Sequence, residues 1–144
     1  MNAHAVRPAT PKDHVALQEL FSAAIARAHW LPSTSRARAD LASVTQNELI
    51  LVHATDDDQI LGFISVYAPE HFVHHLFVAP GFEDKGIGTN LLIELPRYVA
   101  PPWRLKCLTA NSRAMSFYSR RGWAEVERRE GPEGQYALLE KHEA

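Results

Sequence analysis

The sequence predicts a mixed α+β domain over residues 1–144, with one central sheet and helices on both of its faces. Three observations support this fold class. Amphipathic helical segments alternate with short apolar runs rich in β-branched residues. Glycine, proline and aspartate clusters separate these segments, as expected for turns. No repeat or linker divides the chain, and 144 residues is the length of one ordinary domain.

The first helix is expected over residues 11–28, after a short strand at 3–7. Thr10 is a typical N-cap residue, and Pro11 suits the first helical turn because its missing N–H would have no partner there. Apolar residues then recur at helical spacing, which predicts one buried face. A break follows, and a short second helix is expected over 33–44.

Three antiparallel strands are expected next. Strands at 49–54 and 60–67 flank the acidic turn 56–58 and form a hairpin. Pro69 separates this hairpin from a strand at 72–79. Regular alternation places Phe72, His74, Leu76 and Val78 on one face of that strand, with Val73, His75 and Phe77 on the other. A bulge would shift this alternation.

The remaining chain alternates helix and strand. Gly86 opens an apolar helix that Pro96 kinks or ends, because proline lacks a backbone N–H. Asn111 is a typical N-cap for a further helix, and Gly122 is a typical stop. The last strands are expected at 104–109, 123–130 and 135–140, the final two as a hairpin.

The composition excludes strongly charged partners. The net charge is −2 and the pI is near 6.4, so no field favours nucleic acid or an anionic membrane. No apolar run reaches the ~18 residues of a membrane-spanning helix, and the N-terminus lacks a signal-peptide pattern. The single cysteine, Cys107, fits a reducing cytoplasm. Its apolar neighbours favour a buried structural role over that of an acyl-enzyme nucleophile.

The stretch 72–92 carries the clearest functional signal. A strand leads through a Pro-Gly break into a loop, and Gly86 and Gly88 then open a helix. Free amides and the helix dipole attract anions at such a position, and glycine lets a phosphate approach the backbone. The stretch lacks the Gly-Lys-Ser/Thr ending of a P-loop. Leu91 occupies the position where the dinucleotide-binding fingerprint needs a third glycine. A phosphorylated ligand is therefore expected at another kind of loop.

Two motifs resemble those of the GNAT superfamily of N-acetyltransferases. The first is the pyrophosphate loop Q/R-x-x-G-x-G/A, which reads EDKGIG over residues 83–88 and follows Phe77-Val78. Glu83 replaces the usual Gln or Arg, and Asp84 replaces a common glycine. The second motif, N-x-x-A-x-x-x-Y-x-x-x-G-F/W, is matched by Asn111, Ala114, Tyr118, Gly122 and Trp123.

The resemblance implies a GNAT fold, in which a mostly antiparallel sheet splays between its fourth and fifth strands. It also implies acetyl-CoA as the acyl donor, with its pantetheine arm beside the backbone of Phe77 and Val78 and its pyrophosphate on the loop amides. The residues expected to bind the donor are Phe77, Val78, Glu83, Asp84, Lys85, Gly86, Ile87, Gly88, Thr89, Asn111, Ala114 and Phe117.

The implied reaction moves an acetyl group to a primary amine by direct attack in a ternary complex. Tyr118 is the expected acid for the departing thiolate, because a phenol stays protonated at pH 7, and core packing is its alternative role. His74 is the first candidate base and His75 the second, and either histidine can instead only orient its surroundings. Trp30 and Leu31 are expected either at the acceptor pocket or in ordinary core.

No metal site is expected from His71, His74 and His75, because strand alternation separates them and no cysteine or carboxylate set accompanies them. Arg120 and Arg121 are expected at a solvated helix end, and the resemblance leaves a contact with the 3′-phosphate of CoA as their alternative role.

A small-molecule amine is the expected acceptor, with neither nucleic acid nor membrane as a partner. The oligomeric state stays open, a homodimer included. Two alternatives remain: a non-catalytic acyl-CoA-binding sensor or partner module, which Glu83 and Asp84 favour, and a transferase of a longer acyl group.

Overall fold

The computed structural model describes residues 4–28 and 40–143. Within them, one sheet runs in the order β1-β2-β3-β4-β5-β7-β6, and every neighbouring pair is antiparallel except β4 and β5. The strands are β1 (His4–Pro8), β2 (Leu49–Thr55), β3 (Ile60–Tyr67), β4 (Phe72–Val78), β5 (Trp103–Leu108), β6 (Ala124–Gly131) and β7 (Gly134–Lys141).

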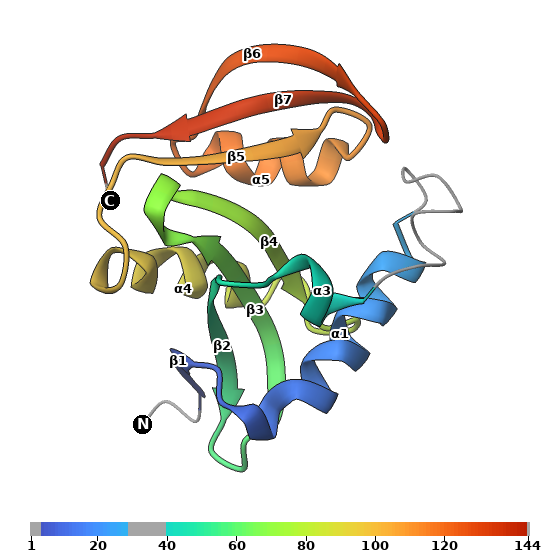
Figure 1. The fold of residues 1–144 in the computed structure, drawn as a ribbon, viewed down its shortest axis with the longest axis vertical. Coiled ribbons are helices and arrows are strands. Elements are labelled where there is room, and N and C mark those ends of the chain that lie inside the picture. The colour runs from blue at the N-terminus through green and yellow to red at the C-terminus, as the bar shows by residue number, and fades with distance from the viewer. Residues whose placement is uncertain (1–3, 29–39, 144) are drawn as a thin grey trace.

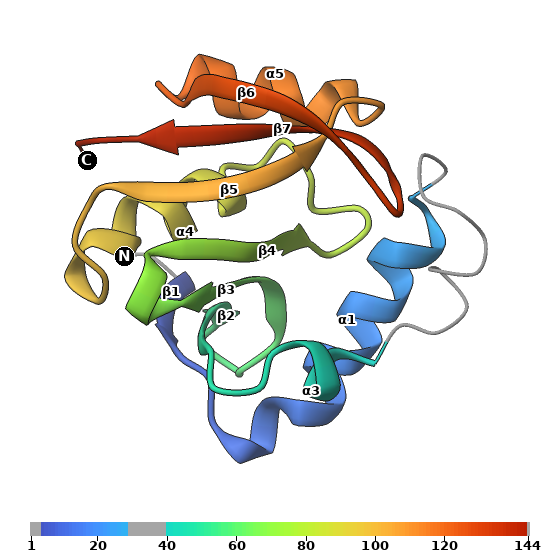
Figure 2. The same cartoon turned by 45° about the horizontal axis from the view of Figure 1, so that its top comes forward.

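Helices cover both faces of the sheet (Figures 1 and 2). On one face lie α1 (His14–Ala26), which follows the 3-10 turn η1 (Pro11–Asp13), and α3 (Leu41–Val44). On the other lie α4 (Ile87–Glu94), continued by the 3-10 turn η3 (Leu95–Arg97), and α5 (Ser112–Arg120). A third 3-10 turn, η2 (Ala68–Glu70), joins β3 to β4. The predicted mixed fold class is confirmed.

Most local predictions are also confirmed. Pro96 ends α4, and the side chain of Asn111 caps α5 by accepting the N–H of Ala114 at 3.1 Å. Gly122 follows α5 with a φ of 88°, a left-handed conformation that suits glycine. Only 41–44 of the second predicted helix is helical within the described residues, and 33–39 lies outside them. No helix in the described part of the chain is long and apolar enough to span a membrane.

β4 contains a bulge at His74. One step along β3, from Ser65 to Val66, corresponds to two steps along β4, from His75 to Val73. The extra residue shifts the side-chain alternation, so Val73 packs into the core under α4 and α5, whereas His75 faces α1. The prediction from regular alternation that Val73 and His75 share one face is therefore wrong. The bulge that the sequence analysis considered for this strand is the reason.

β4 and β5 are joined only where they begin. Two parallel residue pairs connect them, Phe72 with Arg104 and Val73 with Leu105. Beyond these pairs the strands diverge (Figures 1 and 2), although β4 stays paired with β3 and β5 with β7. The predicted splay between the fourth and fifth strands is confirmed.

Gly62 brings α4 close to the sheet. A Cβ atom at this position of β3 would lie 2.8 Å from Cγ2 of Ile87 and 3.0 Å from the carbonyl oxygen of Phe77. The first turn of α4 therefore sits directly on the sheet beside the end of β4, where Gly62 pairs with Val78.

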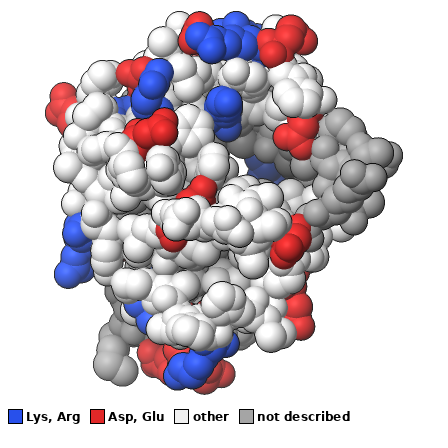
Figure 3. Space-filling model, in the orientation of Figure 1, with Lys and Arg blue, Asp and Glu red and all other residues white. Residues whose placement is uncertain are grey.

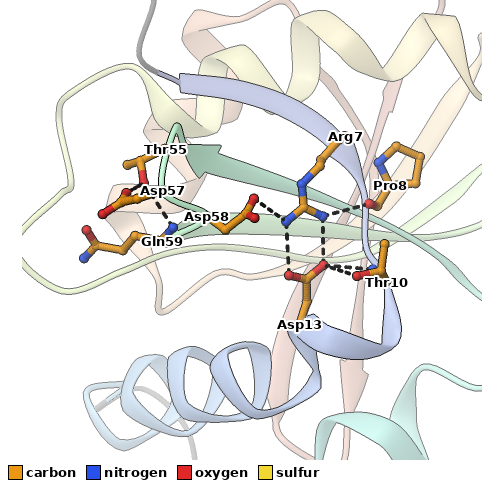
Figure 4. A network of polar contacts seen from close by, with 8 residues as sticks. All are labelled: Arg7, Pro8, Thr10, Asp13, Thr55, Asp57, Asp58 and Gln59. Carbon is orange, nitrogen blue, oxygen red and sulfur yellow. Dashed lines mark hydrogen bonds and ion pairs between the residues drawn. The ribbon is translucent and has the colours of Figure 1, made fainter.

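Asp13 anchors the start of α1. Its carboxylate accepts hydrogen bonds from both terminal nitrogens of Arg7, at 2.8 and 3.1 Å, and from the N–H of Thr10 at 2.8 Å (Figure 4). Arg7 also donates to Asp58 in the β2–β3 turn at 3.2 Å. Asp13 is only 5% exposed, and the hydrogen bonds from Arg7 lower its pKa from 3.8 to about 2. This network ties α1 to β1 and to the β2–β3 turn.

We expect Asp13→Asn to lower the free energy of unfolding at pH 7 by about 2 kcal/mol. This is the free energy that corresponds to the lowering of the Asp13 pKa on folding. Because the folded-state pKa lies below the unfolded-state value, this stability is present above about pH 4 and is lost as the pH falls through about 2. Urea denaturation between pH 7 and 2 measures it, with Asp56→Asn in the nearby β2–β3 turn as the control. Equal stability of Asp13→Asn and wild type at pH 7 would contradict this account.

Candidate functional site

A cleft of 460 Å³ lies where β4 and β5 part. Its walls come from the end of β4, the loop that follows it, the first turn of α4, one side of α5 and the C-terminal end of α1. The surface in Figure 3 is hollowed between the region of β5 and that of α1. Basic and acidic side chains are mixed on this face, so the hollow is not surrounded by charge of one sign.

The loop before α4 brings free backbone amides to this cleft. Gly86 is the N-cap of α4, with a left-handed φ of 83° that glycine adopts without strain. Within the described residues, the N–H groups from Gly86 to Thr89 donate to no backbone carbonyl, and the first helical bond runs from Asn90 to the carbonyl of Gly86 at 2.9 Å. With the positive end of the helix dipole, these amides can hold an anion.

The side wall of the cleft is a stacked pair from α5. A Cβ atom at Gly88 would lie 3.2 Å from Cζ of Phe117, so α4 and α5 approach closely here. The guanidinium of Arg121 lies 3.7 Å from the centre of the Phe117 ring and donates to Oγ1 of Thr89 at 2.8 Å. Arg120 is exposed as predicted, but the prediction of a solvated Arg121 is wrong, because this contact joins α5 to α4.

Two carboxylates lie beside the free amides, and each has a cationic partner. Glu83 accepts the N–H of Gly81 at 2.8 Å and lies 3.9 Å from Arg27, just after α1. Hydrogen bonds from its own amide and from that of Gly81 lower the pKa of Glu83. Asp84 has a φ of 64° and pairs with Arg113 of α5 at 2.8 Å. Arginines from the two sides of the cleft thus balance part of the charge that these residues add.

Tyr118 lines the cleft and is also part of its packed wall. Its ring makes edge-on contacts with Phe117 and Trp123, at 5.2 and 5.6 Å between centres, and the residue is 8% exposed. Burial, with a smaller effect of Cys107, raises the pKa of Tyr118. The phenol therefore keeps its proton at neutral pH.

Cys107 is buried on β5. Burial raises the pKa of its thiol to about 11, so almost no thiolate exists at pH 7. This favours the structural role over the nucleophilic one.

His74 and His75 lie on β4 toward α1 and do not line the cleft. Nδ1 of His75 is 2.8 Å from the hydroxyl oxygen of Ser65, and its ring is 5.5 Å from that of Phe21. Burial, and then the neighbouring His74, lower the pKa of His75 to about 4, which leaves it neutral at pH 7. His74 is more exposed and forms a hydrogen bond through Nδ1 with the carboxylate of Glu48.

The structure brings most of the predicted site residues together. All predicted donor-binding residues except the exposed Lys85 line the cleft, together with Tyr118. Trp30 and Leu31 lie outside the described residues. In the described part of the chain, no group of three or more His, Cys, Asp or Glu side chains is arranged to hold a metal ion.

The sequence prediction missed Arg27 and Arg113, which reach the cleft from α1 and α5, and Glu48, which reaches His74 from the start of β2. A basic residue at the end of the first amphipathic helix was the signal available for Arg27. Glu48 gave no signal, because its partner is 26 residues away in the sequence.

Comparison with solved structures shows the same fold at low sequence identity. YjaB from Escherichia coli, in its apo form, is 19% identical with a TM-score of 0.79, covering 98% of this chain and 99% of that one. The yncA protein from Salmonella typhimurium, solved with acetyl-CoA, is 15% identical with a TM-score of 0.68, covering 98% and 94%. The ribosomal-protein-S18-alanine N-acetyltransferase from E. coli is 16% identical with a TM-score of 0.70, covering 96% and 93%.

A comparison with curated proteins gave no match. The sequence profile of the family described as "Acetyltransferase (GNAT) domain", however, matches residues 16–135. This match covers most of the chain, including both motifs and the whole of the cleft. The chain therefore belongs to the GNAT acetyltransferase family.

Proposed function

We propose that this protein transfers the acetyl group of acetyl-CoA to the primary amine of a small molecule. The observation that carries this proposal is the open edge of β4, which leads directly to the free amides of Gly86–Thr89 within one cleft. An extended amide-containing chain can bind an open strand edge as an additional strand. A diphosphate can bind the helix start that follows. The pantetheine arm and diphosphate of CoA combine these two features in one molecule.

Donor binding uses the backbone more than side chains. The N–H groups and carbonyls of β4 near Phe77 and Val78 bind the pantetheine arm, and the loop amides bind the diphosphate. Gly86 and Gly88 leave these amides uncovered, because no side chain stands between them and the ligand.

The amine must lose a proton before it can attack the thioester carbonyl. His74 is the better placed base, because its side chain is 46% exposed and it lies on β4 just before the splay. His75 is half-buried against Phe21 and Ser65, so it orients the strand and packs against α1. A backbone N–H of β4 donates to the oxyanion that forms during the attack.

The leaving thiolate then takes the hydroxyl proton of Tyr118. As the carbon–sulfur bond breaks, the nitrogen of the new amide gives up its extra proton, which restores the phenol. CoA leaves as the thiol, and the acetylated amine leaves as the amide. Burial of Tyr118 keeps its hydroxyl protonated before each turnover.

Acetyl-CoA binding and CoA release test the function directly. We expect calorimetry to detect acetyl-CoA binding, and a thiol assay to detect CoA release with at least one amine of a panel of small molecules and N-terminal peptides. The peptides are included because one structural neighbour is named for a ribosomal-protein substrate. Tight binding without release would favour the sensor or partner module, and faster release from propionyl- or succinyl-CoA would favour transfer of a longer acyl group.

We expect Tyr118→Phe to lower kcat by about 100-fold, the usual effect of losing one acid–base group. The affinity for acetyl-CoA should stay nearly constant, because the ring that packs against Phe117 and Trp123 remains. The exposed Tyr98 supplies a control, Tyr98→Phe, with full activity expected. A Tyr118→Phe variant with unchanged kcat would remove Tyr118 from the acid role.

We expect Asp84→Asn to tighten acetyl-CoA binding by about threefold at low ionic strength. One unit charge at about 7 Å from a phosphate in a water-like dielectric is worth ~0.6 kcal/mol, and the change also frees Arg113 for the ligand. Asparagine tolerates the left-handed backbone of Asp84, so the loop should keep its shape.

Titration calorimetry at low and high salt measures this effect, which should shrink as salt screens the charges. Glu133→Gln, in the exposed β6–β7 turn, makes the same charge change away from the cleft. Weaker acetyl-CoA binding by Asp84→Asn than by wild type at low salt would contradict the electrostatic argument.

A further inference from the structure

Glu48 is a buried carboxylate on the α1 side of the sheet. Its side chain is only 3% exposed, and one oxygen, Oε2, forms a hydrogen bond with Nδ1 of His74. The other oxygen, Oε1, is buried with no hydrogen-bond partner among the described residues. Burying a carboxylate with an incomplete set of partners is unfavourable, so this arrangement is poorly explained by stability alone.

The bulge in β4 brings His74 to this carboxylate. Its ring lies 5.4 Å from that of Phe72 and 5.6 Å from that of His75, which fixes the imidazole between two neighbours on the same strand. An ionised carboxylate can only accept hydrogen bonds, so Nδ1 of His74 is the donor toward Glu48. In the neutral imidazole, the lone pair is then on Nε2, which has no hydrogen-bond partner within residues 4–28 and 40–143.

We propose that Glu48 is a positioning residue for the acetyl transfer: it orients His74 and makes Nε2 the atom that takes the proton of the acceptor ammonium. This inference rests on the function proposed above and adds a residue to it. The proton moves from the substrate ammonium to Nε2, giving a neutral amine and an imidazolium. The carboxylate of Glu48 stabilises that imidazolium until its proton passes to water.

The strands and the helix around β4 carry several other titratable groups. His75 is neutral at pH 7, because burial and His74 lower its pKa to about 4. On β5, Arg104 pairs with Glu140 of β7 at 3.2 Å, and Lys106 lies 5.0 Å from the centre of the Tyr136 ring. On α1, the nearest such groups are His14 and Glu19, which line the same surface hollow as Glu48.

The first test reads the tautomer of His74 without measuring activity. Nitrogen NMR of ¹⁵N-histidine-labelled protein, with the His74 signals assigned by a His74→Gln variant, should show Nδ1–H in the neutral wild-type ring. Glu48→Met replaces the carboxylate with an apolar side chain of similar volume. In that variant we expect His74 to change to the Nε2–H tautomer that free histidine prefers.

The second test compares stability with turnover. Glu48→Met should unfold at the same temperature as wild type or a higher one, because it removes a buried charge. Its kcat/KM should nevertheless fall by roughly 10- to 100-fold. Glu48→Gln, which keeps an oxygen acceptor, should recover part of the activity, and Glu19→Gln should behave as wild type.

The inference is overturned if Glu48→Met keeps the Nδ1–H tautomer or wild-type turnover. It is also overturned if both Glu48 variants lose turnover only in proportion to lost folded protein. A changed tautomer with unchanged turnover would show that His74 is not the base, while acetyl transfer itself would stand. Wild-type protein that acetylates no amine would overturn the proposed function itself. The wild-type assay is therefore carried out before any variant is measured, which separates the two failures.

Discussion

The separation of β4 from β5 is the constraint on which the rest of the structure depends. Only two residue pairs join these strands, yet they connect the half of the sheet formed by β1 to β4 with the half formed by β5, β7 and β6. An open strand edge normally invites pairing with another chain. Here α4 and α5 flank the opening, and the contact of Arg121 with Phe117 and Thr89 fixes the spacing between these helices. The open edge thus becomes a narrow cleft.

The bulge at His74 places the two faces of β4 in two different environments. Leu76 and Val78 face the side of α4 and α5, where the free amides of the loop are found. His75 and Phe77 face α1, which the network around Asp13 holds against the sheet. Under the proposed function, the acyl donor and the amine approach β4 from opposite sides, and the splay is where they meet.

The sequence predicted the fold and most of the residues that line the cleft because both depend on local signals. Helical spacing, turn residues and the glycines of the 83–88 loop each report on a few neighbouring residues. Contacts across the sheet were not predictable in the same way. Arg121 looks like any basic residue at a helix end until Thr89 and Phe117 are beside it.

Glu48 illustrates the same limit more sharply. It precedes β2 in a stretch with no pattern that indicates burial, and its partner His74 lies on β4, 26 residues away. The prediction that Val73 and His75 share a face failed for a related reason: one inserted residue reverses a period of two, and the bulge depends on the pairing with β3. The acceptor pocket is least accessible to sequence reasoning, because the residues expected there form no recurring pattern.

The absent side chain of Gly62 has a consequence for how variants of this protein should be interpreted. The hydrogen atom at this position sets the gap between β3 and the first turn of α4, where Ile87 and the carbonyl of Phe77 are both within reach of a single added carbon. A methyl group there would force Ile87 in the first turn of α4, or the carbonyl of Phe77, to move. A substitution in the middle of the sheet would therefore disturb the helix start whose free amides line the cleft, although Gly62 itself does not line it.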